Sequence, residues 1–294
     1  MKRALIFPGQ AAQFEGMGKS IVEKHPESSS ILDAANEVLG FDIREIMFEG
    51  SADDLKRTDV TQPAVFIHSY MMLQSRDTVD FKAVAGHSLG EFTALVAAGV
   101  MTFQEGLELV KTRSSLMQEA CAATNGSMAA IIGLEDDVVE KICDDINGEV
   151  VAANYNCPGQ LVISGEMSAL EEATAKMTEA GARRAMILSV GGAFHSSLMS
   201  SASEGLSSAI NSIKFEAPKC AIYQNVDGKS YTDPEKIKAN LISQLDSSVR
   251  WTQTIQNMIG DGIEEFIEVG GKGNILNGMI RRIDRSAKTE AWKE

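Results

Sequence analysis

The stretch that decides the fold reads FKAVAGHSLGEFTALVAA and runs from Phe81 to Ala98. A short β-prone run leads into G-H-S-L-G, and a segment of good helix formers follows directly. This is the G-x-S-x-G pattern in its meaningful setting, a strand, a tight turn and a helix. Gly86 and Gly90 leave room beside Ser88, because a residue without Cβ permits close backbone approach. The pattern predicts Ser88 as a nucleophile beside a helix N-terminus; a glycine-rich turn with a serine cap is the plainer alternative.

The composition is that of an ordinary globular protein, with 294 residues of which 44% are hydrophobic and 23% charged. The net charge of −14 argues against nucleic acid as a partner, since such binders present basic surfaces. No apolar run approaches the roughly 18 residues of a membrane span, and Ala4–Phe7 is too short for a signal peptide. We therefore expect a cytoplasmic protein with no membrane partner. The cysteines lack metal-ligand spacing, so we expect reduced thiols and no metal site: Cys121, Cys143, Cys157 and Cys220.

The order of the predicted elements places the chain in the α/β class. Residues 126–190 follow the order β-α-β-β-α-β, which is the ferredoxin-like pattern. We expect them to form a small subdomain inserted into a large α/β-hydrolase-like domain of residues 1–125 and 191–294. A central, mainly parallel sheet is expected in the large domain. There the sequence also predicts an apolar helix over 62–73 with Pro63 in its first turn, a helix over 237–245, and a final strand at 264–269.

Arg113 interrupts the apolar stripe of a helix predicted over residues 102–122. Apolar residues recur around it at spacings of three, four and seven, so this face is expected to be buried. An arginine on such a face must pair with an anion, because an isolated buried charge is very costly. One interpretation is an internal salt bridge with Glu91 or Glu119. The other is a clamp for a substrate carboxylate, which a guanidinium grips with two hydrogen bonds. The pattern leaves both open.

A serine nucleophile needs an adjacent base, and the sequence offers four histidines. His25 lies in a polar helix and His68 inside an apolar one, where a satisfied core residue is expected. His87 adjoins Ser88, but neighbouring side chains in a tight turn point apart. His195 remains, in a glycine-containing loop at a strand end, and we predict it as the base. No acidic residue lies just before His195 as a candidate partner, so a backbone carbonyl or an amide side chain is expected to orient the imidazole.

The loop that follows the first predicted strand contains proline, glycine and glutamine in residues 8–13. Strand ends of this kind are where α/β proteins place binding groups. The position allows Gln10 to supply a backbone N–H to a developing oxyanion.

The sequence resembles a known family in these and other residues. It is similar to the malonyl-CoA:acyl carrier protein transacylases of fatty acid synthesis, and more distantly to the acyltransferase domains of polyketide synthases. The similarity runs along the full length, and the combined motifs are far more specific than G-x-S-x-G alone. The matching motifs are Phe7–Gln10, Gly86–Glu91, Arg113 before Leu116–Gln118, Ala153–Asn154 to Gly165, Gly192–Ser196, Asn225–Gly228, Gln244–Leu245 with Val249–Trp251, and Glu268–Gly270.

The resemblance implies a role for each residue of the predicted centre. Ser88 would take the malonyl group from coenzyme A as an ester, with His195 as the general base and then the acid. The backbone N–H groups of Gln10 and Leu89 would form the oxyanion hole. The resemblance implies no cofactor, and its partners are malonyl-CoA and acyl carrier protein.

It also implies roles for residues around that centre. Arg113 would hold the free carboxylate of the malonyl group, and Phe194 would crowd an α-methyl branch. Gln244 matches the residue whose backbone carbonyl orients the histidine. The sequence departs from the family at Ser248, where relatives often have proline before Val249. This departure places the geometry of the loop that carries Gln244 in question.

Three other functions share parts of this pattern. A serine esterase or thioesterase has the same turn and histidine but needs no buried arginine. A stand-alone acyltransferase serving a polyketide synthase would share every motif, although a chain of this length without a ketosynthase favours a dissociated system. A docking module with an inactive turn would form no serine adduct. The basic clusters 183–184 and 281–288 are solvated helix faces by default and docking surfaces for an acidic carrier as the alternative.

Overall fold

The chain is described by a computed structural model that covers residues 1–76 and 80–294. Its larger sheet has six strands in the order β10-β9-β1-β2-β7-β8. Neighbouring strands are parallel except for β8, which runs antiparallel to β7 at one edge. The α/β class and the mainly parallel sheet are therefore as predicted. The strands are β1 Arg3–Phe7, β2 Ala83–Gly86, β7 Ala221–Tyr223, β8 Ser230–Tyr231, β9 Glu265–Glu268 and β10 Lys288–Ala291.

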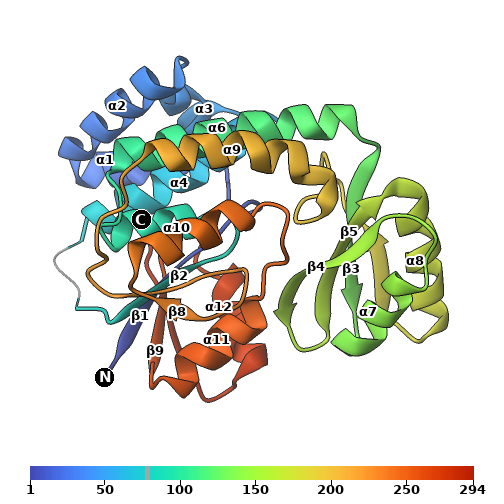
Figure 1. The fold of residues 1–294 in the computed structure, drawn as a ribbon. Helices are drawn as coiled ribbons and strands as arrows, with labels where there is room; N and C mark the ends of the chain where they lie inside the picture. Colours follow the sequence, from blue (N-terminus) through green and yellow to red (C-terminus); the bar gives the residue numbers. More distant parts are fainter. Residues whose placement is uncertain (77–79) are drawn as a thin grey trace.

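Helices cover both faces of this sheet (Figure 1). Side chains alternate along β1, so Leu5 and Phe7 join the core with α4 and α6, while Ala4 and Ile6 join α11 and α12. Burial on both faces explains why β1 and β2 read as continuous apolar runs. The helices are α1 Lys19–Lys24, α2 Ser29–Leu39, α3 Ile43–Glu49, α4 Thr58–Gln74, α5 Gly90–Ala97, α6 Phe103–Ala123, α9 Ser200–Ser212, α10 Pro234–Ser243, α11 Trp251–Gly260 and α12 Ile275–Ile283.

A second, antiparallel sheet lies beside the first and has the order β4-β5-β3-β6 (Figure 1). One face packs against α7 and α8 in a core of its own that includes Ile163 and Leu170. The other face carries Met128 and Val162, which belong to the main core. The observed element order is the predicted β-α-β-β-α-β. The elements are β3 Gly126–Ile132, α7 Asp136–Asp144, β4 Val150–Cys157, β5 Gln160–Glu166, α8 Met167–Glu179 and β6 Arg184–Ile187.

The structure corrects several element boundaries. Helix α4 begins at Thr58, so Pro63 lies inside the helix and not in its first turn. The missed residues, 58–61, include Thr58 and Thr61, which are buried but carry no apolar signal in the sequence. Helix α10 likewise begins at Pro234, three residues before the predicted start. Strands β8 and β10 were not predicted, because both are short edge strands with polar residues.

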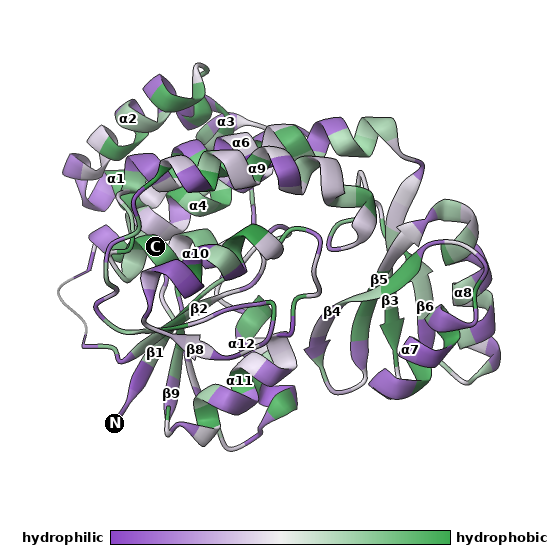
Figure 2. Ribbon diagram, viewed as in Figure 1, coloured by the Kyte–Doolittle hydropathy of each residue, from purple (hydrophilic) through white to green (hydrophobic). Residues whose placement is uncertain are grey.

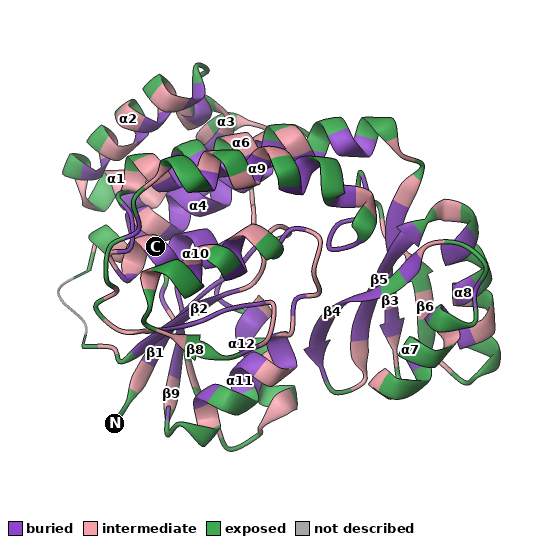
Figure 3. Cartoon of the chain, in the orientation of Figure 1, coloured by how far each residue is buried: buried purple, intermediate pink, exposed green. Residues whose placement is uncertain are grey.

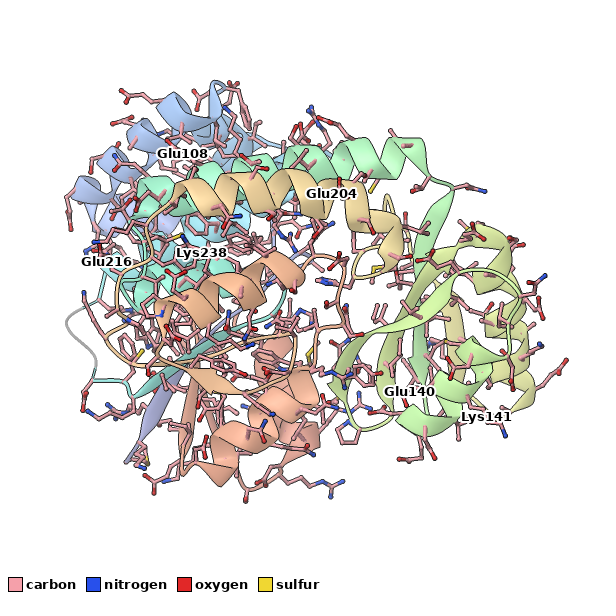
Figure 4. All side chains as sticks on the ribbon, viewed as in Figure 1. Glu108, Glu140, Lys141, Glu204, Glu216 and Lys238 are labelled. Carbon is pink, nitrogen blue, oxygen red and sulfur yellow. The ribbon has the colours of Figure 1, made fainter. Side chains whose placement is uncertain are left out.

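Apolar residues lie mostly in the interior, and charged residues lie mostly on the surface. Figures 2 and 3 show the apolar and the buried residues concentrated in the sheets and the inward helix faces. Glu108, Glu140 and Glu204, labelled in Figure 4, are exposed on the helices. Among the described residues, no helix combines the length and the apolarity that crossing a membrane requires. Glu91, Arg113 and Glu268 are exceptions to the exposure of charge, since all three are buried.

His68 lies inside α4, and both of its ring nitrogens have partners. Nε2 lies 2.6 Å from Glu294 Oε1, and Nδ1 accepts a hydrogen bond from the Gly271 N–H at 3.3 Å. Glu294 also accepts hydrogen bonds from the Gly18 N–H at 2.8 Å and from the Ser20 hydroxyl at 2.6 Å. His68 is therefore a satisfied core residue, as the sequence predicts.

The carboxylate of Glu294 makes this contact sensitive to acid. Burial alone would raise the pKa of Glu294, but hydrogen bonds from His68, Ser20 and the Gly18 N–H lower it to about 2. Folding thus favours the ionised form, so the stabilisation is full above the unfolded pKa of about 4.3 and is lost as the pH falls toward 2. We expect Glu294→Gln to lower the free energy of unfolding by about 2 kcal/mol at pH 7 and by less at pH 3.

Urea denaturation at the two pH values measures this difference. Glu290→Gln, which changes an exposed carboxylate on β10, is the matched control and should have little effect at either pH. A loss of stability in Glu294→Gln that does not change with pH would contradict the assignment.

Candidate active site

The turn between β2 and α5 brings three backbone segments into contact. A Cβ on Gly86 would lie 1.9 Å from the Gly90 carbonyl carbon, and one on Gly90 would lie 2.0 Å from the Phe7 carbonyl oxygen. Glycine is therefore required at both positions. Ser88 has a φ of 52°, a left-handed conformation that costs free energy in a residue with a side chain. This strained turn presents the hydroxyl at the carboxyl end of β2.

Asn225 holds the turn from the end of the neighbouring strand β7. Its Oδ1 accepts a hydrogen bond from the Ser88 N–H at 2.7 Å, and its Nδ2 donates to the Gly86 carbonyl at 2.7 Å. Its own N–H donates to Glu91 Oε2 at 2.9 Å. Asn225 was not among the predicted site residues, although a polar residue at a strand end was a usable signal.

His195 lies against the serine hydroxyl. Its Nε2 is 2.7 Å from Ser88 Oγ, and its Nδ1 lies 3.1 Å from the Gln244 carbonyl and 3.0 Å from the Ser247 carbonyl. A backbone carbonyl in place of an acid was expected at Gln244, whereas the second carbonyl at Ser247 was not. With Nδ1 donating to these oxygens, Nε2 is left to accept the proton of Ser88. His87 turns away and lies 2.8 Å from Asn156 Oδ1.

The protonation of His195 is controlled by burial and by one nearby cation. Desolvation, followed by the positive charge of Arg113, lowers the pKa of His195 to about 3, against the opposing effect of the Gln244 and Ser247 carbonyls. The imidazole is therefore neutral at physiological pH, which is the form that acts as a base.

Arg113 is fully buried and has no carboxylate partner among the described residues. Its Nη1 donates to Gln62 Oε1 at 2.7 Å, and its Nη2 donates to Ser88 Oγ at 2.9 Å and lies 3.4 Å from Gln244 Oε1. An ion pair with Glu91 or Glu119 is not formed. Burial lowers the pKa of Arg113 to about 10, so the side chain stays charged at neutral pH. Its hydrogen-bond partners are neutral amide and hydroxyl oxygens.

These residues open into a cavity of about 240 Å³ between the two sheets. Gln10, Leu89 and Phe194 line it together with Ser88, Arg113 and His195. The backbone N–H groups of Gln10 and Leu89 donate to no acceptor in the described part of the chain. The remaining wall is largely apolar and includes Met117, Met128, Val162, Leu188, Val190 and Met279. The cavity thus combines a serine, a base, free N–H donors and a buried cation.

Ser248, the departure from the family pattern, leaves the histidine contacts in place. Both carbonyls of its loop remain within 3.1 Å of the imidazole Nδ1. The Ser248 hydroxyl donates instead to the Ala152 carbonyl at 2.6 Å. The loop that carries Gln244 therefore holds His195 without the proline, and the Ser248 hydrogen bond fixes this loop to β4.

Comparison with protein families agrees with this arrangement. The model of the acyl transferase domain matches residues 4–291. The chain belongs to this family. A malonyl CoA-acyl carrier protein transacylase of Staphylococcus aureus is 40% identical to this acyl transferase over 290 residues, covering 98% of the chain and 94% of the relative. One from Bacillus subtilis is 39% identical over 297 residues, covering 99% and 93%.

Solved structures match the acyl transferase along its whole length. An acyl carrier protein S-malonyltransferase from Vibrio cholerae has a TM-score of 0.95 and 40% identity, covering 100% of this chain and 97% of that chain. A malonyl-transacylase in complex with a type II polyketide synthase acyl carrier protein has a TM-score of 0.95 and 34% identity, covering 100% and 96%. The resemblance seen in the sequence is confirmed at the level of the family.

The contacts of Asn225 predict how the acyl transferase responds to its loss. Asn225→Ala leaves the Ser88 N–H and the Gly86 carbonyl without partners in the interior, and each buried unsatisfied group costs about 1–3 kcal/mol. We expect a loss of about 3 kcal/mol in unfolding free energy, measured in urea, and slower acylation of Ser88. Asn257→Ala is the control, because its amide donates to the Gly228 carbonyl away from the cavity. Acylation at the unmodified rate in Asn225→Ala would show that the turn holds Ser88 unaided.

Proposed function

We propose that this protein transfers the malonyl group of malonyl-CoA to the phosphopantetheine thiol of acyl carrier protein, in fatty acid biosynthesis. The observation that carries the proposal is a buried arginine that has no carboxylate partner among residues 1–76 and 80–294 and lies within hydrogen-bonding distance of the serine oxygen. Full-length similarity to malonyl CoA-acyl carrier protein transacylases supports the same conclusion. The site residues divide the work in two half-reactions.

In the first half-reaction, Ser88 Oγ attacks the thioester carbon of malonyl-CoA. His195 Nε2 takes the hydroxyl proton, and the Gln244 and Ser247 carbonyls hold the ring while it carries positive charge. The carbonyl oxygen becomes an oxyanion, for which we assign the N–H groups of Gln10 and Leu89. One such donor typically stabilises the transition state by about 3 kcal/mol. The C–S bond breaks, and His195 returns its proton to the leaving coenzyme A thiolate.

In the second half-reaction, the carrier thiol attacks the malonyl ester on Ser88. His195 takes the thiol proton and then protonates Ser88 Oγ as the ester C–O bond breaks. The same site thus serves the acyl donor and then the acceptor thiol, so ping-pong kinetics follow.

Two residues are assigned to acyl selection. Arg113 is proposed to hold the malonyl carboxylate. Gln62 accepts a hydrogen bond from only one of its terminal nitrogens, Nη1, and the guanidinium lines the cavity, so other N–H donors can reach a ligand there. Phe194 is proposed to crowd an α-methyl branch, because its ring lines the cavity next to His195.

The proposal also covers the domain organisation and the cellular location of the chain. We infer a large α/β-hydrolase-like domain of residues 1–125 and 191–294 and an inserted ferredoxin-like subdomain of 126–190. The separate core of the second sheet supports this division. We place the enzyme in the cytoplasm, where acyl carrier protein substrates would meet it.

A polyketide pathway is the second candidate for the carrier. It is favoured by the similarity to a malonyl-transacylase solved with a type II polyketide synthase carrier protein. The chemistry at Ser88 is the same in both pathways, so a panel of carrier proteins, scored for malonyl transfer, separates them.

The covalent intermediate distinguishes the transferase from its rivals. After incubation with malonyl-CoA, mass spectrometry should find a malonyl mass on the Ser88 peptide, and Ser88→Ala should show none. An acceptor thiol should discharge the adduct faster than water does. An unmodified Ser88 peptide would favour a docking module, and rapid hydrolysis without benefit from carrier protein would favour an esterase or thioesterase.

The selectivity of the cavity rests on Arg113. Arg113→Ala should reduce malonyl transfer by about 100-fold or more, because a charge-assisted bidentate contact is lost, while acetyl transfer should fall much less. Steady-state rates with malonyl-CoA and acetyl-CoA measure the ratio. Arg44→Ala, which removes a half-buried arginine bound to Asp33 and Ser29, is the matched control. Equal loss of both activities would remove Arg113 from the assigned role.

A further inference from the structure

The loop that leads into α11 is joined to the edge of the second sheet. The Val249 N–H donates to the Ala153 carbonyl at 2.8 Å, and the Val249 carbonyl accepts from the Tyr155 N–H at 2.9 Å. These bonds form a parallel bridge between Val249 and Asn154. The register of β4 against β5 shifts between Ala152 and Asn154, so β4 is bulged where the loop meets it. Bulges of this kind re-aim a strand beside a site.

Ser248 adds a side-chain bond beside this bridge. Its hydroxyl donates to the Ala152 carbonyl at 2.6 Å, across 96 positions of sequence. A neutral hydrogen bond contributes only about 1 kcal/mol to stability. Its direction matters more than its strength, because it fixes one residue of the loop against the strand.

The loop fixed in this way supplies both acceptors of the imidazole. Gln244 and Ser247 present carbonyl oxygens at 3.1 and 3.0 Å from His195 Nδ1. The Ser247 carbonyl belongs to the peptide group whose nitrogen is that of Ser248. Because a peptide group is planar, rotation about the N–Cα bond of Ser248 changes the position of the Ser247 oxygen relative to the Ser248 side chain.

We propose that Ser248 is a positioning residue for His195. Its hydroxyl locks the 247–248 peptide to β4, and this peptide keeps the proton on Nδ1 and leaves Nε2 to the hydroxyl of Ser88. Two neutral carbonyls attract an imidazolium less strongly than a carboxylate does. The orientation of the His195 ring therefore depends on the exact position of these two oxygens. Strand β4 also supplies Asn154 and Asn156 to the cavity wall, so one strand sets both the wall and the base. The inference rests on the proposed function and adds a residue to it.

Three variants test the role by activity. Ser248→Ala removes the hydroxyl, and misplacing a catalytic group by a fraction of an ångström should lower kcat for malonyl transfer roughly tenfold. KM should change little, because Ser248 does not line the 240 Å³ cavity. Ser248→Thr keeps a hydroxyl and should restore most of kcat. Ser212→Ala is the matched control, since its hydroxyl donates to the Ala209 carbonyl at 2.7 Å on the exposed side of α9.

Proton NMR of histidine-labelled protein tests the role without substrate. The Nδ1–H proton of His195, assigned by its absence in His195→Gln, should be a sharp downfield signal that exchanges slowly with water. In Ser248→Ala it should broaden or exchange at least several-fold faster, and in Ser248→Thr and Ser212→Ala it should be unchanged.

The outcomes separate this inference from the proposed function. A perturbed His195 signal in Ser248→Ala supports positioning even if malonyl transfer itself is not observed. An unchanged signal with an unchanged kcat overturns it. A lower kcat with an unchanged signal also overturns it, because the effect would then be structural and not directed at His195.

Discussion

The architecture depends on the close approach of three backbone segments at the turn after β2. Gly86 contacts Gly90, and Gly90 contacts the carbonyl of Phe7, so β1, β2 and α5 have a single mutual arrangement. This approach forces Ser88 into a left-handed conformation, and the surrounding hydrogen bonds must repay that strain. Asn225 supplies two of them from the end of β7, and its own N–H is held by the buried Glu91. The nucleophile is therefore positioned by the packing of the whole parallel sheet and not by its own loop.

The same packing creates an unusual balance of buried charge. Arg113 and Glu91 are both buried, yet they form no direct ion pair. Burial raises the pKa of Glu91 to about 7, while hydrogen bonds from the Asn225 N–H and the Gln224 amide favour its ionised form. The amide oxygens of Gln62 and Gln244 accept hydrogen bonds from Arg113 Nη1 and Nη2 without neutralising its charge, and its buried Nε has no partner among the described residues. Neutral amide dipoles therefore surround this cation, and its charge is not cancelled as it would be by a carboxylate.

The site residues that could be predicted are those marked by their neighbours in the sequence. The turn at Ser88 follows from G-x-S-x-G between a strand and a helix, Arg113 stands out within an apolar stripe, and His195 is what remains of four histidines. The position of Asn225 after a strand marks it as a candidate, but its contact with Ser88 could not be predicted, because the two residues are 137 positions apart and meet through the pairing of β2 with β7. A carbonyl such as that of Ser247 has no side-chain signature at all. Strand β10 was not predicted, because its residues are mostly polar and it lies at the edge of the larger sheet.

The charge of Arg113 also bears on the strength of the base. This cation is the second cause, after burial, of the depressed pKa of His195. A base with so low a pKa is weak, because efficient proton transfer needs a pKa nearer the operating pH. On the proposed role, a malonyl carboxylate at Arg113 offsets the positive charge and so raises the pKa of His195. An acyl group without a carboxylate leaves the guanidinium unpaired and the base weak. The preference for malonyl would then be expressed in the rate of acylation as well as in binding, because the ligand that satisfies the arginine also activates the histidine.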